Sequence, residues 1–136
     1  DTCCVKNLAA DTATLSGALT GVSASFSGAL SAASVTLTKA TATQATSKTT
    51  AVTLNGAAGV VTTVALTDVA DAAFTFTLTN SAIAATSVIL TNVDMNSGNG
   101  KAIVNVTPGA GSATFTVTNV GTAAFNSAIK IGFVVI

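Results

Sequence analysis

Apolar and polar residues alternate along two segments near the end of the sequence, residues 113–118 and 128–136. The first segment places Phe115 and Val117 on one face, and the second places four apolar side chains on one face. Alternation with a period of two is typical of a β-strand that is buried on one side. We therefore expect the two segments to form the last hairpin of a β-domain. An apolar strand left at an open sheet edge would promote aggregation, so we expect this one to be paired within a sheet or an interface.

The same alternation begins at residue 51 and recurs between short segments rich in Asn, Asp and Gly, which are typical of turns. Seven strands at this spacing predict an all-β fold, an antiparallel β-sandwich of the jelly-roll or Ig-like type. The predicted strands are residues 51–55, 60–66, 73–79, 87–93, 102–107, 113–118 and 128–136.

The predicted core consists of the apolar positions on one face of each strand. Two positions stay open between neighbours, Val60 or Val61 and Ile103 or Val104. The other expected members are Val64, Leu66, Phe74, Phe76, Leu78, Val88, Leu90, Val106, Phe115, Val117, Ile129, Ile131, Phe133 and Val135.

An internal repeat precedes the predicted sandwich: LSGAL at residues 15–19 recurs as FSGAL at residues 26–30. This 11-residue offset fits a right-handed coiled coil, and it also fits short extended segments that form a fibrous β-stalk with other chains. Gly17, Gly21 and Gly28 would each cost a helix about 1 kcal/mol relative to Ala, so we favour the extended structure. The large apolar residues of this part are expected to contact other chains: Leu8, Leu15, Leu19, Phe26, Leu30 and Leu37.

Residues 39–50 contain no large apolar residue, and this composition predicts a linker. We therefore expect an extended repetitive arm or stalk over residues 1–44 and a β-sandwich head domain over residues 45–136. Ordering about 25 residues of such an arm costs roughly 40 kcal/mol in conformational entropy, at about 1.5 kcal/mol each. A thin segment cannot bury enough apolar surface on itself to offset that cost, so the arm needs partner chains.

The composition changes the picture because the chain carries very few charges. Only 7% of the 136 residues are charged, the net charge is zero, and Glu, Arg, His, Trp and Tyr are absent. Binding to nucleic acid or to an anionic membrane needs a basic surface, which five lysines do not supply. No apolar run reaches the roughly 18–20 residues of a membrane-spanning helix, so we expect no membrane insertion. A surface with so little charge favours association, and we expect a homo-oligomer.

Cys3 and Cys4 are adjacent and are the only cysteines of the chain. Neighbouring Cα atoms lie about 3.8 Å apart, below the usual disulfide range of about 4.4–6.8 Å, so a bond between the two would form a strained ring. The alternatives are a disulfide from each cysteine to another chain, which would staple the base of an oligomer, or two free thiols. Two lone cysteines without a neighbouring His are a poor metal site.

Candidate chemical sites are few, and each has a plainer explanation. The loop from Asp94 to Gly100 places oxygen-bearing side chains as a calcium loop does, but it lacks the downstream bidentate acid, so we expect a hairpin turn. Asp68 and Asp71 flank a loop with no visible partner for acid–base work, so we expect solvated or turn-stabilising acids. Asn105 begins a glycosylation sequon within a predicted strand, and a Pro follows the sequon at once, which disfavours its use.

Catalysis is not expected. A nucleophilic Ser or Thr needs a neighbouring base, and the chain has no His. The turn from Gly56 to Gly59 lacks the Lys-Ser/Thr pair of a phosphate-binding loop. We therefore predict no enzyme activity, no catalytic residues, no cofactor and no bound metal.

Three segments of the second half of the chain resemble a known group of structural proteins. Residues 80–90 read NSAIAATSVIL, residues 105–121 read NVTPGAGSATFTVTNVG, and residues 126–136 read NSAIKIGFVVI. They are similar to parts of fibre-, spike- and appendage-like structural proteins of bacteriophages and large DNA viruses. The likeness covers roughly residues 60–136. Domains of that kind sit at the ends of repetitive β-stalks, which the Ser-Gly-Ala-Leu repeat resembles.

The resemblance implies a non-catalytic, homotrimeric component of a virion, at the virion surface or otherwise extracellular, that assembles with other virion proteins. A host surface is a further partner that the resemblance suggests, although no binding residues carry over. Receptor-binding tips often display aromatic side chains, whereas several of the six Phe residues fall in the predicted core, which favours a structural role.

Two other classes of protein stay open. The first is a subunit of a cellular extracellular filament or surface layer, in which residues 1–38 would be donated as a strand to the next subunit. A closed trimer has a fixed mass, whereas an open filament grows with concentration. The second is a carbohydrate-binding sandwich, which the absence of Trp and Tyr disfavours.

Overall fold

The computed structural model describes residue 31 and residues 33–136, and these residues form eight β-strands and no helix. Contacts divide the chain into two units, Asp1–Val35 and Thr36–Ile136, and all eight strands belong to the second unit. In chain order the strands are β1 (Lys39–Thr43), β2 (Val52–Thr53), β3 (Ala58–Thr62), β4 (Ala73–Thr79), β5 (Ile89–Asp94), β6 (Ala102–Gly109), β7 (Ser112–Asn119) and β8 (Lys130–Val135).

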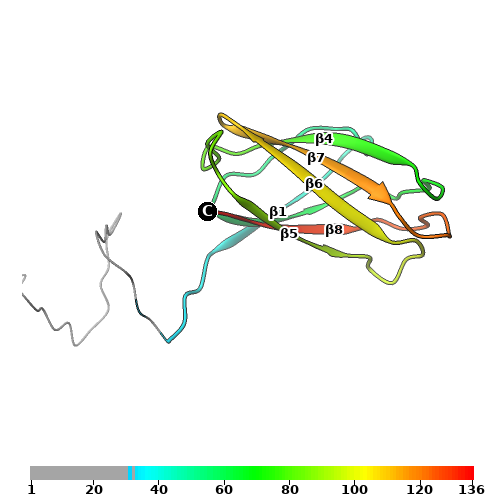
Figure 1. The fold of residues 1–136 in the computed structure, drawn as a ribbon, viewed down its shortest axis with the longest axis horizontal. Helices are drawn as coiled ribbons and strands as arrows, with labels where there is room; N and C mark the ends of the chain where they lie inside the picture. The colour runs from blue at the N-terminus through cyan, green and yellow to red at the C-terminus, as the bar shows by residue number, and fades with distance from the viewer. Residues whose placement is uncertain (1–30, 32) are drawn as a thin grey trace, which may run out of the picture. The chain divides into compact units, whose positions relative to one another are not determined.

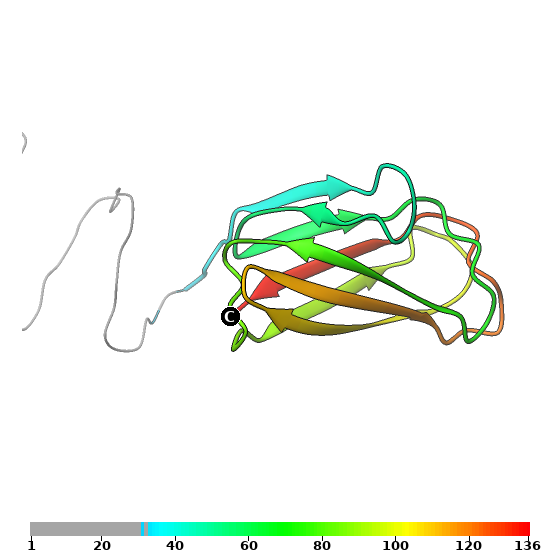
Figure 2. The ribbon, with the colours of Figure 1, turned by 90° about the horizontal axis from the view of Figure 1, so that it is seen from above.

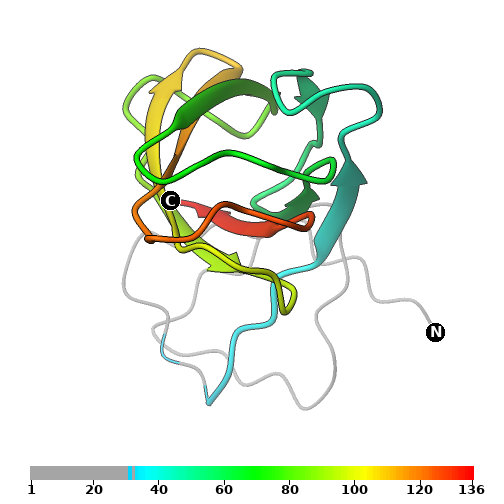
Figure 3. The same cartoon turned by 90° about the vertical axis from the view of Figure 1, so that its right-hand side faces the viewer.

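The strands form two four-stranded sheets in the arrangement of a β-sandwich (Figure 1, Figure 3). Sheet A has the order β1-β3-β8-β5, and sheet B has the order β2-β4-β7-β6. Four of the neighbouring pairs are antiparallel, but β1 is parallel to β3 and β2 is parallel to β4. The all-β class is therefore confirmed, whereas both sheets are mixed rather than purely antiparallel. The parallel pairs arise because the chain changes sheet at each step from β1 to β4, so that β2 intervenes between β1 and β3 and β3 intervenes between β2 and β4.

The core lies between the sheets and depends on alternating side chains. In β4, Phe74, Phe76 and Leu78 are buried while the threonines between them are exposed. The rings of Phe76 and Phe115 stack with centroids 5.2 Å apart, and Phe133 of sheet A meets Phe115 edge-on at 6.5 Å. Aromatic pairs in these geometries contribute about 0.5–1.5 kcal/mol beyond their burial. The other buried members of the core cluster are Val52, Leu54, Val61, Leu66, Ile83, Ala113, Val117, Phe125, Ile129 and Ile131.

Most of the predicted core is confirmed, but the expected face of β5 is wrong. Val88 and Leu90 point outward and are exposed, whereas Ile89 packs against the core. The three residues form the continuous apolar run Val-Ile-Leu, so alternation alone fits either face. Of the two alternative core residues in β6, Val104 packs against the core, whereas Ile103 is exposed on the outer face.

The expected last hairpin is also wrong, because its two arms lie in different sheets. β7 lies between β4 and β6 in sheet B, whereas β8 lies between β3 and β5 in sheet A. Residues 120–129 carry the chain from one sheet to the other, and Phe125 and Ile129 of this connection are buried. The apolar arm is nevertheless paired within a sheet, as expected, because β8 has a neighbour on each side.

The expected linker at residues 39–50 begins with a strand of sheet A. β1 forms the edge of that sheet, in cyan in Figure 2, and pairs with β3 over its whole length. An edge strand can consist of small residues because only Ala42 packs against the core. The loop that follows is fastened by the buried Gln44, whose amide Nε2 donates to the carbonyls of Lys48 and Thr50 at 2.9 and 3.0 Å.

Candidate assembly surface

The outer face of sheet B is lined with hydroxyl groups. Strand alternation sends every second residue of β4 and β7 outward, and most of these residues are threonines. The register places them in rows, such as Thr75 beside Thr116 and Thr77 beside Thr114. Hydroxyl groups bind water without carrying charge. This face can therefore remain exposed to solvent although the chain has few charged residues. The polar residues of the face are Thr53, Thr75, Thr77, Thr79, Asn105, Thr107, Ser112, Thr114, Thr116 and Thr118.

The outer face of sheet A is apolar at the end where β8 finishes and β5 begins. Phe133 points into the core, so Val134 and Ile136 point outward. Val134 pairs with Leu90, and Ile136 exchanges two backbone hydrogen bonds of 2.9 Å with Val88, which places all four side chains on one face. β3 extends this surface on the other side of β8. The apolar patch, as we define it, consists of the exposed Val88, Leu90 and Ile136, the half-buried Val60 and Val134, and the buried Ala58.

The apolar patch is the exposed apolar cluster that needs an explanation. Val88, Leu90 and Ile136 are 58%, 55% and 72% exposed. Burying a whole aliphatic side chain is worth about 1.5–3 kcal/mol, so covering these three would stabilise a complex by roughly 1 kcal/mol each. Single exposed apolar residues are common, whereas contiguous ones with a polar border mark an interaction surface. The patch is therefore the candidate functional site of the described residues.

The border of the patch is a polar row at the other end of the same face. Lys130 of β8 pairs in register with Thr62 of β3 on one side and Asp94 of β5 on the other. The Lys130 Nζ lies 4.0 Å from Asp94 Oδ2, and both side chains are largely exposed. A single exposed pair at this distance contributes little to stability, so both charges are available to a partner.

The predicted chain contacts fall mostly outside the described residues. Leu37 is described, and it is 46% exposed, two residues before Lys39 at the start of β1. Lys39 pairs in register with Ala58 of the apolar patch, so Leu37 lies where the chain enters this end of sheet A. The other predicted contacts and the disulfide candidates lie outside the described residues: Cys3, Cys4, Leu8, Leu15, Leu19, Phe26 and Leu30.

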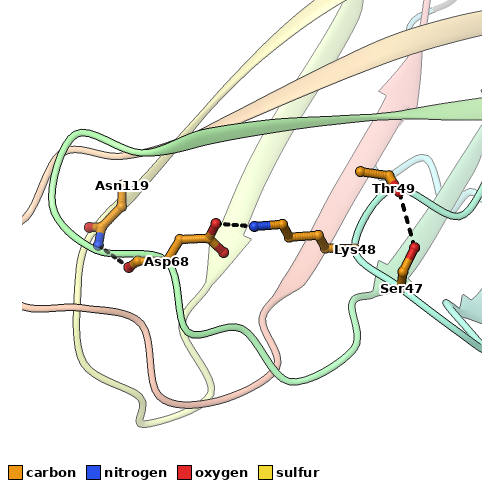
Figure 4. Close-up of polar contacts among 5 residues, drawn as sticks. All are labelled: Ser47, Lys48, Thr49, Asp68 and Asn119. Carbon is orange, nitrogen blue, oxygen red and sulfur yellow. Dashed lines mark hydrogen bonds and ion pairs between the residues drawn. The ribbon is translucent and has the colours of Figure 1, made fainter.

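Asp68 is not the solvated loop acid that the sequence suggested. Its carboxylate is buried and forms an ion pair with Lys48 through Oδ1, while Oδ2 has no hydrogen-bond partner (Figure 4). The Lys48 Nζ also lies 5.4 Å from the centre of the Phe74 ring. The pair therefore fastens the 44–51 loop to β4 and the 63–72 loop. Asp71 is exposed and adopts a φ of 62°, which is typical of an acid in a turn.

Two buried asparagines hold the loops at the two ends of the sandwich. The Asn119 amide donates to the carbonyls of Asp68 and Ala123, and its Oδ1 accepts from the backbone N–H groups of Lys101 and Gly121 at 3.1 and 3.0 Å (Figure 4 shows the bond to Asp68). Asn80 makes comparable bonds to the backbone of the loop before β3. Both residues stood in turn signals of the sequence, but nothing in a turn signal indicates burial.

The Asp94 loop is a connection between sheets rather than the expected hairpin turn. It joins β5 of sheet A to β6 of sheet B. Asp94 Oδ1 accepts a hydrogen bond from the N–H of Asn96 at 2.8 Å, and Asn96 and Ser97 have positive φ values. These features are those of an Asx turn. Within residues 33–136, no group of three or more Asp, Glu, His or Cys side chains is placed to hold a metal ion.

No family model, curated protein or solved structure significantly matches this chain. The described part of the chain contains no helix that could span a membrane.

Proposed function

We propose that this protein is a structural component of a virion, a fibre, spike or capsid-decorating protein that assembles through apolar β-surfaces and performs no catalysis. The observation that carries the proposal is the contrast between the two outer faces of the sandwich. One face is covered with hydroxyl groups, and the other bears the apolar patch. A domain with one hydrated face and one face that bears an apolar patch is suited to an assembly in which other subunits bury the patch.

The segments that resemble viral fibre proteins include part of this surface. Residues 80–90 contain Val88 and Leu90, and residues 126–136 contain the whole of β8. Charged residues make up 7% of the chain and its net charge is zero, a composition that favours association over a soluble monomeric state. The resemblance and the patch therefore support the same role.

The finer architecture of the proposal is a homotrimer on the virion surface. The sandwich would be a jelly-roll or Ig-like head, and the repetitive residues before β1 would form an extended stalk with the stalks of two other copies. Cys3 and Cys4 would staple the stalk between chains. Other virion proteins would bind the base of the stalk. The head, at the other end, would be placed to contact the host surface.

The role in a virion is tested on purified particles. An antibody against the recombinant protein should label the particle surface in electron micrographs, and peptides of this chain should cofractionate with the particles in a density gradient. Peptides and label that follow cell envelopes or cellular filaments instead would contradict the viral role and favour the alternative below.

The alternative is a cellular filament or surface layer assembled by strand exchange, and one observation favours it. β1 is an edge strand with mostly exposed small side chains, and its outer edge has no neighbouring strand among the described residues. Such an edge can accept a strand from another subunit. In this version the free edge of β1 in one subunit would accept the predicted arm, residues 1–38, of the next subunit.

Native mass separates the two versions. Light scattering over a concentration series should give a fixed mass of three chains for the proposed trimer, with or without reductant. Reductant should change only the covalent linkage through Cys3 and Cys4, because the apolar surfaces supply the driving force. A mass that rises without limit with concentration would replace the closed trimer by the open filament.

A further inference from the structure

We infer that the apolar patch is covered by the same face of other copies of this chain, with Asp94 of one copy facing Lys130 of the next. The inference deepens the proposed function by naming the interface, and it rests on the self-assembly part of that function alone. It concerns the outer face of sheet A and adds the exposed Leu37 to it.

The charges on this face indicate which partner fits. The patch itself has no charged side chain, so its partner must present an apolar surface. The face presents both signs of charge: Lys130 and Asp94 lie side by side at its polar border, and the exposed Lys39 of β1 pairs with Ala58 beside the patch. A partner of a single charge sign would repel either Asp94 or the two lysines. A second copy brings both signs, and a ring of copies pairs each Asp94 with the next Lys130.

The size of the patch shows that the interface must extend beyond it. A stable interface buries about 800 Å² per partner and involves roughly 20–30 residues on each side. Six patch residues are too few, so neighbouring surface must take part. Leu37 is the available apolar extension, because it precedes β1 at the end of sheet A where Lys39 pairs with Ala58.

Two exposed apolar residues of the described chain, Ile103 and Val69, lie away from this face. Ile103 is 54% exposed, close to the value for Leu90, but it lies on the outer face of sheet B among the threonines. Val69 is 65% exposed and lies in the loop between β3 and β4. Ile103 therefore offers a matched control, with similar size, exposure and strand context on the face that we assign to solvent.

The first experiment compares Leu90→Asp with Ile103→Asp in the full chain under reducing conditions. Sedimentation over a concentration series should show that Leu90→Asp weakens association at least about tenfold, the factor equivalent to 1.4 kcal/mol. Ile103→Asp should associate as the wild type does. Both positions are more than half exposed, so both variants should keep the wild-type far-ultraviolet circular dichroism and unfolding transition. If Leu90→Asp lost the fold, Val88→Lys would take its place with the same expectation.

The second experiment tests whether the partner is another copy. Asp94→Lys gives the border two cations, and Lys130→Asp gives it two anions, so each variant alone should associate about two- to fivefold more weakly. An equimolar mixture, with one variant carrying a mass tag, should associate more tightly than either variant alone and contain both chains in each oligomer, although a ring of three copies regains only two of its three border contacts. That result would identify copies of this chain as the occupants.

Three outcomes would overturn the inference: a wild-type chain that stays monomeric at all concentrations, equal effects of the two Asp substitutions at Leu90 and Ile103, or a mixture that associates no better than its components. None of these outcomes depends on finding the protein in virions. Absence from purified particles would remove the viral role and leave the interface standing, so the two failures are distinguishable.

Discussion

At the scale of single residues, a few buried polar side chains decide where the loops lie. Asn119 is fully buried and has four backbone partners from three segments of the chain. The sequence predicted a turn beginning at this residue, whereas Asn119 is the last residue of β7. Its burial could not be predicted, because that depends on the 120–129 connection folding back over it on the way to sheet A. The Lys48–Asp68 pair was missed for the same reason, since the two residues are distant in the sequence.

Replacing Asn119 by Ala should lower the free energy of unfolding by about 2–4 kcal/mol. The change removes four hydrogen bonds worth about 1 kcal/mol each and leaves some of the backbone partners buried without a substitute. Denaturant unfolding measures the effect. Asn105→Ala is the matched control, because Asn105 is exposed on sheet B and its loss should cost less than about 0.5 kcal/mol. Equal effects at the two positions would contradict the role that we assign to Asn119.

At the scale of the elements, alternation predicts a strand well where one face is apolar and the other polar. β4 and β7 have this pattern, and their bounds and inward faces came close to those of the structure. β1 was missed because its residues are small on both faces, which leaves no periodicity to detect. β5 was assigned the wrong face because it begins within a continuous apolar run, and only its pairing with β8 selects the inward side. The apolar patch follows from that assignment, so the sequence alone could not show it.

The two faces of β5 can be separated by substitution. Ile89→Ser should lower the free energy of unfolding by about 2 kcal/mol, because Ile89 packs against the core. Leu90→Ser should change it by less than about 0.5 kcal/mol, because the side chain is on the outer face. The measurement is denaturant unfolding at a protein concentration low enough to exclude association. The opposite order of effects would mean that Leu90, not Ile89, faces the core.

At the scale of the whole molecule, the folded unit extends further toward the N-terminus than composition suggested. The second unit is Thr36–Ile136, and it includes β1, which a boundary at residue 45 removes. The composition of residues 39–50 is typical of a linker because the segment has no large apolar residue to bury. An edge strand needs none, since its backbone hydrogen bonds to β3 hold it in place.

Two fragments test this boundary. The fragment Thr36–Ile136 should unfold cooperatively with the same free energy as this unit in the full chain. The fragment 45–136 should be less stable by about 2 kcal/mol, because it lacks the backbone bonds between β1 and β3 and the packing of Ala42. Urea unfolding followed by circular dichroism compares them. Equal stability of the two fragments would show that β1 adds nothing to the fold.

The position of β8 sets the order in which a nascent chain can mature. β4, β6 and β7 are complete once residue 119 has been synthesised, so most of sheet B can form early. Sheet A cannot be completed then, because β3 and β5 meet only through β8, which is made after the other seven described strands. Until β8 emerges, the edges of β3 and β5 that it joins stay unpaired, and a chain interrupted before it should be cleared by proteases rather than accumulate. Any chain that enters an assembly should therefore contain β8. In this way the strand order keeps truncated chains out of the assembly.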